Sequence, residues 1–214
     1  MTEPVDWYFD PISPFAFLQW RRIHRDHAAL AARLRPVPVL LAGLLAHHGT
    51  VGPAETPGKR RHTYRQVLWR ARRDGIALAF PPAHPFNPLP ALRLCLAAGA
   101  DARAVEAVLD HVWGRGQAGD SVPALAPVAA TLGIDDAAAA LDAAAVKARL
   151  RANTEAAIAA GVFGVPTLVA GGELFWGDDA TAMALHWLAD RSDFEDPAMR
   201  ALDALPVAVQ RSRG

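Results

Sequence analysis

The sequence predicts an α/β protein in which a small β-sheet is divided along the chain by a long helical insertion. Residues 5–9, Val-Asp-Trp-Tyr-Phe, form a short aromatic and β-branched run that is typical of a buried strand. Residues 167–176 contain two more strand patterns around a Gly-Gly turn. Almost everything from residue 41 to residue 160 has helical spacing. A chain of 214 residues is long enough for one large domain, or for one domain with a sizeable insertion.

The first elements form a βαβ unit. After strand 5–9 comes Ser13, a good N-cap, and Pro14, a good first helical residue, so a helix is expected from there to about His27. Residues 34–40 form the second strand. Two prolines within it place this strand at an edge of the sheet or near one.

The segment 41–159 is expected to fold as an inserted all-helical domain. Capping residues and glycines bound its helices, which are expected at about 59–74, 87–98, 101–114, 121–132, 135–141 and 143–160. The Leu, Val and Trp positions of the Ala-rich part recur at helical spacing, so packed helices explain it better than low complexity does.

Residues 161–168, Gly-Val-Phe-Gly-Val-Pro-Thr-Leu, are the most informative stretch. A Val-Pro-Thr tripeptide can open any edge strand, but it is also how thioredoxin-like domains enter their third strand, with the proline cis. Only about 5 to 6% of X-Pro bonds in folded proteins are cis, and those that are kept fix a tight turn. We expect a cis Val165–Pro166 bond that leaves the Val165 backbone facing the site, where it can pair with an extended peptide.

Strand 167–170, strand 173–176 and a helix at about 179–188 complete the pattern. Without its middle, the chain reads as βαβ followed by αββα, the order of a thioredoxin-like fold with a helical domain inserted between its halves. Residues 1–40 and 160–190 are therefore expected to form the thioredoxin-like domain. Residues 191–214 lose the pattern and are expected to form a loosely docked tail.

The cysteine count excludes dithiol oxidoreductase chemistry. Thioredoxins carry Cys-x-x-Cys at the start of the first helix, where this chain has Ser13-Pro14-Phe15-Ala16. The single cysteine, Cys95, lies in an Ala/Leu-rich helix and is expected to be a small buried apolar residue.

Charge and hydropathy exclude several classes of partner. The 22 basic residues balance 22 acidic ones, so no nucleic-acid partner is expected. No apolar run approaches the length of about 18 residues that a membrane helix needs, and the first nine residues lack the pattern of a signal peptide. His24 and His27, and the adjacent pair His47 and His48, lack a cysteine or carboxylate partner at metal-ligand spacing, so no metal is expected. We expect a cytoplasmic protein without a membrane partner, and a homodimer.

Collinear segments of the chain resemble the 2-hydroxychromene-2-carboxylate isomerase family. They are residues 9–16, 84–93, 112–114, 161–167 and 175–179. This family is similar to kappa-class glutathione transferases and, more distantly, to DsbA-type proteins. The resemblance covers about residues 5–188 and implies a glutathione-dependent cis-trans isomerase of aromatic degradation, or a relative that kept the glutathione site for another substrate.

The resemblance brings the thiol of glutathione to the start of the first helix, and residue chemistry supports this placement. A thiol has a pKa of about 8.5 in water, but of about 3.5 to 7.5 at helix N-termini. Ser13 can donate its hydroxyl hydrogen to the sulfur while the helix N–H groups stabilise negative charge. Alternatively, Ser13 merely caps the helix and contributes about 1 kcal/mol.

The resemblance also implies the other site residues. Glutathione is expected to contact Ser13, Phe15, Thr50, Lys59, Val165, Pro166, Asp178 and Asp179, and the small aromatic acid substrate is expected to contact Asn87 and Arg93. Lys59 can pair with a carboxylate of glutathione, and an acid at 178 or 179 with its ammonium. The plain alternatives are a solvated face for Lys59 and helix caps for the aspartates and Asn87.

Four positions depart from the family pattern. Thr50 stands near a family Asn, and Ala180 stands where the family continues with Arg after the acidic pair. His62 and Gln66 replace Tyr and Asp, which bears on the substrate pocket more than on the fold. Three functions are open from the sequence: the isomerase, a kappa-type transferase that uses the same thiolate, and a non-catalytic thioredoxin-fold protein that binds peptides.

Overall fold

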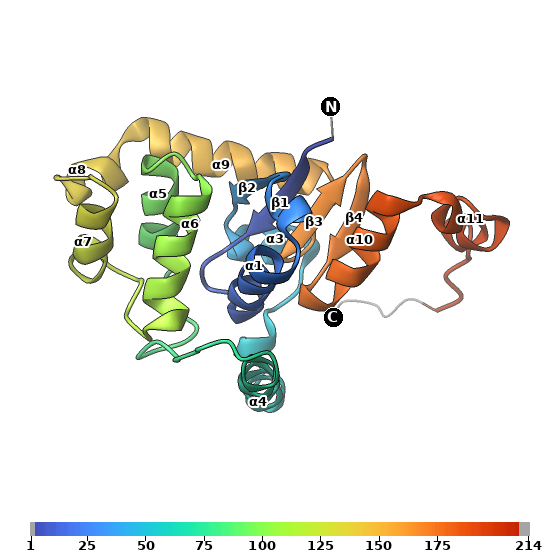
Figure 1. Cartoon of the computed structure of the whole chain (residues 1–214), viewed down its shortest axis with the longest axis horizontal. Helices are drawn as coiled ribbons and strands as arrows, with labels where there is room; N and C mark the ends of the chain where they lie inside the picture. The colour runs from blue at the N-terminus through green and yellow to red at the C-terminus, as the bar shows by residue number, and fades with distance from the viewer. Residues whose placement is uncertain (1–2, 210–214) are drawn as a thin grey trace.

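A mixed sheet of four strands lies at the centre of the computed structural model, which describes residues 3–209 (Figure 1). The strand order is β2-β1-β3-β4. β1 (Val5–Phe9) pairs in parallel with β2 (Leu34–Pro38) and antiparallel with β3 (Thr167–Ala170), which pairs antiparallel with β4 (Glu173–Trp176). The four strands and their connections confirm the predicted α/β, thioredoxin-like fold class.

The central strand β1 is buried because its side chains pack on both faces of the sheet. Trp7 stacks on Phe9 with 4.5 Å between ring centroids, and its indole N–H donates to the Gln19 side chain at 2.7 Å. Tyr8 points to the other face, into a cluster with Val39 and other residues. β2 forms an edge, as its prolines predict, since a proline has no N–H for a second neighbour.

Helices cover both faces of the sheet. α1 (Pro14–Asp26) and α10 (Thr181–Ala189) share one apolar cluster with β1, β3 and β4. α3 (Leu41–His48) and the end of α9 (Ala144–Ala159) pack on the opposite face (Figure 1). α2 (Ala28–Ala31) is a short addition between α1 and β2.

The remaining helices of the insertion are α4 to α8. Their bounds are Pro57–Arg73, Leu89–Ala97, Ala102–Leu109, Val122–Thr131 and Ala137–Asp142. α5, α6 and α7 contribute to the same buried cluster as β1 and α1, so the insertion and the sheet share a core. The division into two domains at residues 41 and 159 stays a prediction. Cys95 on α5 is fully buried, and burial raises the pKa of its thiol.

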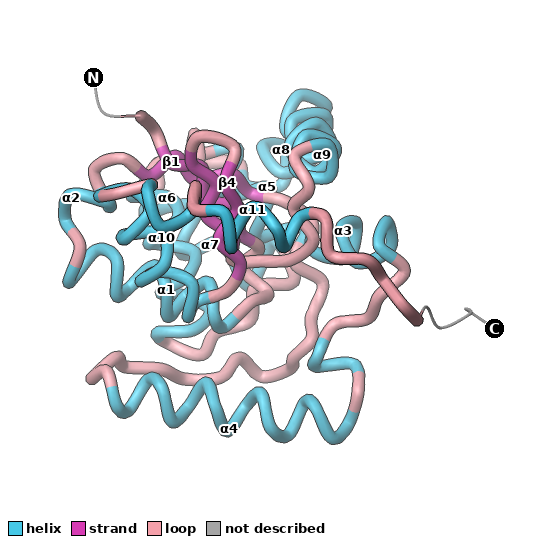
Figure 2. The backbone as a smooth tube through the Cα atoms, turned by 90° about the vertical axis from the view of Figure 1, so that its right-hand side faces the viewer, coloured by secondary structure: helices cyan, strands magenta, loops and turns pink. Residues whose placement is uncertain are grey.

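The connection between α4 and α5 contains no helix, as the gap between the helices expected at 59–74 and 87–98 predicts. Residues 76–88 contain no helix or strand, because four prolines in this segment remove backbone donors. The helix expected from residue 87 begins instead at Leu89, with Pro88 as its N-cap. α6 continues into a π-helical turn, Asp110–Gly114. α4 runs along one side of the molecule (Figure 2).

The tail contains structure that the sequence pattern did not predict. A 3-10 turn, Ser192–Phe194, and a helix, α11 (Pro197–Asp203), follow α10. Phe194 packs edge-on against Phe175, with 6.4 Å between the ring centroids. Residues 1–2 and 210–214, the outer ends of the predicted segments 1–40 and 191–214, lie outside the described residues. Between residues 3 and 209, no helix combines the length and the apolar character that crossing a membrane requires.

Candidate functional site

Ser13 is the N-cap of α1. Its Oγ accepts a hydrogen bond from the Ala16 N–H at 3.3 Å, and its side chain is nearly buried. Because the hydroxyl acts here as an acceptor, its own hydrogen is left to donate elsewhere. The capping role and the donor role can therefore hold together.

The loop before Ser13 is held from three sides. The Trp113 indole N–H donates to the Pro11 carbonyl at 2.7 Å. The fully buried Asp10 carboxylate accepts from the Ile12 N–H at 3.0 Å and from the Leu41 N–H at 2.9 Å. These bonds join β1, the insertion and the start of α3, so the N-terminus of α1 is fixed before any ligand arrives.

Tyr64 and His84 add a further support that sequence reasoning missed. His84 Nε2–H donates to the Ile12 carbonyl at 2.8 Å, and the Tyr64 hydroxyl lies 2.7 Å from His84 Nδ1 and 2.8 Å from the His84 carbonyl. Burial lowers the pKa of His84, which favours its neutral form. The peptide bond from His84 to Pro85 is cis.

Asp10 makes folding stability depend on pH. Burial raises its pKa to about 7, although the Ile12 and Leu41 N–H groups oppose the shift. An unfolded Asp has a pKa of about 3.9, so between about pH 4 and pH 7 the folded chain holds a proton that the unfolded chain has released. Raising the pH through this window therefore lowers the free energy of unfolding, by at most about 1.4 kcal/mol per pH unit.

We predict that Asp10→Asn removes this slope. Urea unfolding of parent and variant should be measured from pH 4 to about pH 8. As pH rises, the free energy of unfolding should fall less in the variant than in the parent. Asp135→Asn, at an exposed acid, is the control. Parallel stability profiles for parent and Asp10→Asn would contradict the prediction.

The Val165–Pro166 bond is cis. Tyr8 near the end of β1 pairs with Thr167 at the start of β3. The segment that carries Ser13 and the segment that carries Pro166 therefore meet the sheet at the same end of its central strands. The Pro166 carbonyl accepts from the Gly177 N–H at 2.8 Å. Within residues 3–209, no backbone hydrogen bond outside the helices and strands involves Val165.

The two predicted acids after β4 have different environments. Asp178 is buried, and its carboxylate pairs with Arg22 on α1 and, at 2.8 Å, with Arg70 on α4. The Asp179 side chain is 76% exposed and lies 3.8 Å from Arg70. Of the two, Asp179 is better placed for a ligand ammonium, because two guanidinium groups already hold Asp178.

The other predicted contacts with glutathione come from α1, from the residues after α3 and from α4. Phe15 is the second residue of α1, half-buried under the Arg70 guanidinium. Thr50 is exposed just after α3. Lys59 is exposed in the first turn of α4 and forms no ion pair with a described residue. Their contacts with glutathione stay predictions.

The two residues predicted to contact the substrate lie at different places, Asn87 just before α5 and Arg93 within it. Asn87 is exposed, and its side-chain oxygen accepts from the Leu89 N–H at 3.2 Å just before the helix. Arg93 lines a small hollow of about 100 Å³ together with Leu141 and Asp142 of α8. The structure gives Asn87 an accessible position and places Arg93 against the helices of the insertion.

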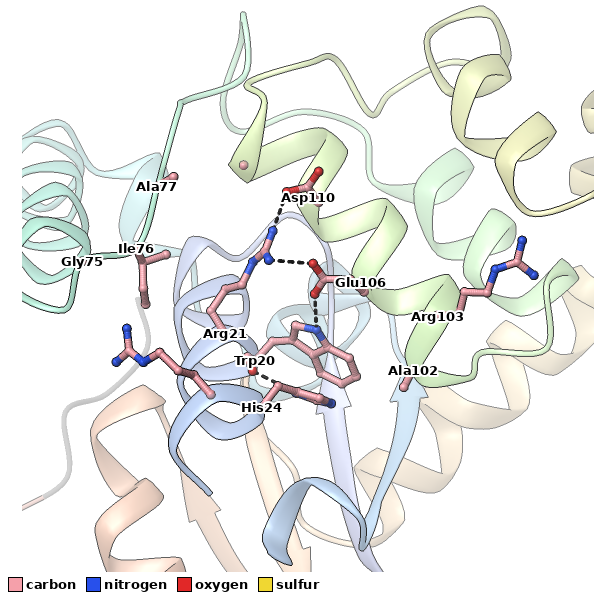
Figure 3. Close-up of a pocket in the computed structure, with 12 residues that line it drawn as sticks. Trp20, Arg21, His24, Gly75, Ile76, Ala77, Ala102, Arg103, Glu106 and Asp110 are labelled. Carbon is pink, nitrogen blue, oxygen red and sulfur yellow. Dashed lines mark hydrogen bonds and ion pairs between the residues drawn. The ribbon is translucent and has the colours of Figure 1, made fainter. Parts of the chain in front are cut away.

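A cavity of about 810 Å³ lies beside the middle of α1, against α6 (Figure 3). Arg21 pairs with Glu106 at 2.7 Å and with Asp110, and the Trp20 indole N–H donates to Glu106 at 2.7 Å. These charged groups satisfy one another. None of the predicted site residues lines this cavity, so it is distinct from the site at Ser13.

Comparison with known proteins agrees with the thioredoxin-like fold described above. A family model described as a DSBA-like thioredoxin domain matches residues 4–189. The 2-hydroxychromene-2-carboxylate isomerase of Pseudomonas putida is 36% identical over 192 residues, which cover 84% of this chain and 91% of that protein. Glutathione s-transferase kappa 2 of Caenorhabditis elegans is 28% identical over 176 residues, 76% of this chain and 78% of that one.

A solved structure of a 2-hydroxychromene-2-carboxylate isomerase matches with a TM-score of 0.72 and 28% identity, and the match covers 94% of this chain and 99% of that chain. Sequence and structural similarity thus extend over nearly the whole of both chains. The chain belongs to the DSBA-like thioredoxin family and, within it, to the family of 2-hydroxychromene-2-carboxylate isomerases.

Proposed function

We propose that this protein is a glutathione-dependent cis-trans isomerase of 2-hydroxychromene-2-carboxylate or a related small aromatic acid. The observation that carries the proposal is the geometry of Ser13, which caps α1 as an acceptor and keeps its hydroxyl hydrogen for a sulfur at the helix N-terminus. The relatives named 2-hydroxychromene-2-carboxylate isomerase support the reaction type.

The residues predicted to contact glutathione carry groups that suit an extended, charged tripeptide. The Val165 backbone beside the cis peptide bond suits pairing with an extended chain. The exposed ammonium of Lys59 suits a carboxylate, and the exposed carboxylate of Asp179 suits an ammonium. Glutathione carries groups of all three kinds.

Glutathione, when bound, would supply a nucleophilic thiolate for cis-trans isomerisation of a conjugated substrate and would not be consumed. The protein would activate the thiol electrostatically. The N–H groups of α1 stabilise negative charge at the sulfur, and Ser13 donates a hydrogen bond to it. Trp113, His84 and Asp10 hold the loop that presents these donors.

Calorimetric titration with glutathione, followed by a turnover assay on a conjugated aromatic acid, tests the proposal. We expect saturable binding at one site per chain, and isomerisation that requires glutathione while its concentration stays constant. Isomerisation without glutathione, or no glutathione binding, would contradict the proposal. Binding of an extended peptide in the absence of glutathione binding would favour a non-catalytic peptide-binding protein.

A kappa-type transferase is the second candidate, supported by the relative from Caenorhabditis elegans. The two functions share the activated thiolate and differ in the electrophile. An aryl halide distinguishes them, because a transferase consumes one glutathione for each product formed. The homodimer and the cytoplasmic location stay predictions.

Lys59→Ala is predicted to weaken glutathione binding by about 1 to 3 kcal/mol, the range for a hydrogen bond to a charged partner. Stability should change by less than about 0.5 kcal/mol, because Lys59 is exposed. Arg61→Ala, at an exposed cation two residues away, is the control for net charge. If both variants bound glutathione as the parent does, Lys59 would be a residue of the solvated face.

A further inference from the structure

Arg70 on α4 lies among three residues that the resemblance assigns to glutathione. Its Nη1 donates to Asp178 at 2.8 Å, and its Nη2 lies 3.8 Å from the Asp179 carboxylate. Its guanidinium carbon is 5.5 Å from the centroid of the Phe15 ring, which is two positions after Ser13. The packing of α4 thus brings a cation to the start of α1.

The two aspartates of this cluster are placed differently, one inside the protein and one at its surface. Asp178 is only 1% exposed at its side chain and is shared by Arg22 and Arg70, so its charge is used inside the protein. Arg70 keeps further N–H donors, since a guanidinium has five and a single one reaches Asp178 within hydrogen-bond distance. The Arg70 side chain, 15% exposed, thus lies beside the exposed carboxylate of Asp179.

A neighbouring cation and anion match a zwitterion. The γ-glutamyl end of glutathione carries an ammonium and a carboxylate on one carbon, and a guanidinium presents its donors in the planar fork that a carboxylate accepts. We infer that Arg70 binds the α-carboxylate of the γ-glutamyl residue while Asp179 accepts its ammonium. This inference rests on the proposed glutathione site. It also explains how the chain can carry Ala180 where the family has Arg, because α4 supplies a guanidinium instead.

The test compares two probes by calorimetry: glutathione, and γ-aminobutyryl-cysteinylglycine, which lacks only the α-carboxylate. The parent should bind glutathione about 10- to 100-fold more tightly than the analogue. Arg70→Gln should lose that factor for glutathione and bind the analogue as the parent does. Arg72→Gln, at an exposed arginine of the same helix, should bind both probes as the parent does.

Arg70 also pairs with Asp178, so a folding defect must be separated from a binding defect. Arg70→Lys keeps a cation beside Asp178 but loses the planar fork, and it should show an intermediate loss that is confined to glutathione. Equal losses for both probes in Arg70→Gln and Arg70→Lys, or equal affinity of the parent for both probes, would overturn the role of Arg70 and leave the proposed function standing. If the parent bound neither probe, both the role and the proposed function would be overturned.

Discussion

Ser13→Asp is expected to give a stable protein that has lost nearly all glutathione-dependent activity. Asp caps a helix as well as Ser does, so α1 keeps the N-cap that accepts from Ala16. Its charge, however, lies where the thiolate must form. Two charges about 4 Å apart repel by roughly 4 kcal/mol at an effective dielectric of 20, which opposes ionisation of the thiol by about three pKa units.

Ser13→Asn is the matched control, because Asn caps equally well and adds no charge. Thermal unfolding should give similar midpoints for the parent and both variants. In a turnover assay at saturating glutathione, Ser13→Asn should be far more active than Ser13→Asp. Full activity of Ser13→Asp would show that Ser13 does nothing more than cap the helix.

Asp178→Ala is expected to lower the free energy of unfolding by about 3 to 5 kcal/mol, because it leaves two partly buried guanidinium groups without their shared anion. For a chain of this length, a loss of about 3 kcal/mol lowers the melting temperature by about 6 to 12 °C. Arg22 and Arg70 come from α1 and α4, so the loss should also loosen α4 from the thioredoxin-like half.

Asp179→Ala is the control for this effect, since it removes the adjacent acid while Asp178 stays in place. Asp179 is largely exposed, and its removal should change stability by less than about 0.5 kcal/mol. Thermal unfolding without glutathione measures both variants. Equal stabilities for the two variants would mean that the buried ion pairs of Asp178 contribute little to the fold.

The elements of the fold could be predicted because their signals are local. Ser13 and Pro14 mark the start of α1, and Asp101 and Ser121 cap α6 and α7 as their positions predict. The helix α11 in the tail was not predicted, because the helical pattern fades after residue 190.

The site was predictable only where a motif carries it. Ser13, Pro166 and Asp179 stand in family segments, so a resemblance could identify them. Tyr64 and Arg70 lie on α4, and their contacts depend on how this helix packs against the rest of the protein. Tyr64 contacts His84, which in turn binds the Ile12 carbonyl, and Arg70 binds Asp178 directly. No spacing in the sequence indicates these contacts. For Asp178 the motif predicts a ligand contact, and the tertiary structure adds two ion pairs, with Arg22 and Arg70, that the sequence does not indicate.

Titration of the ultraviolet absorbance of the thiolate in bound glutathione tests most directly whether the N-terminus of α1 activates the sulfur. The parent protein is saturated with glutathione, and the absorbance is followed against pH relative to free glutathione. We predict an apparent pKa in the range of about 3.5 to 7.5, as for thiols at helix N-termini, against about 8.5 for a free thiol. A bound thiol that titrates at or above the pKa of free glutathione would contradict the proposed mechanism.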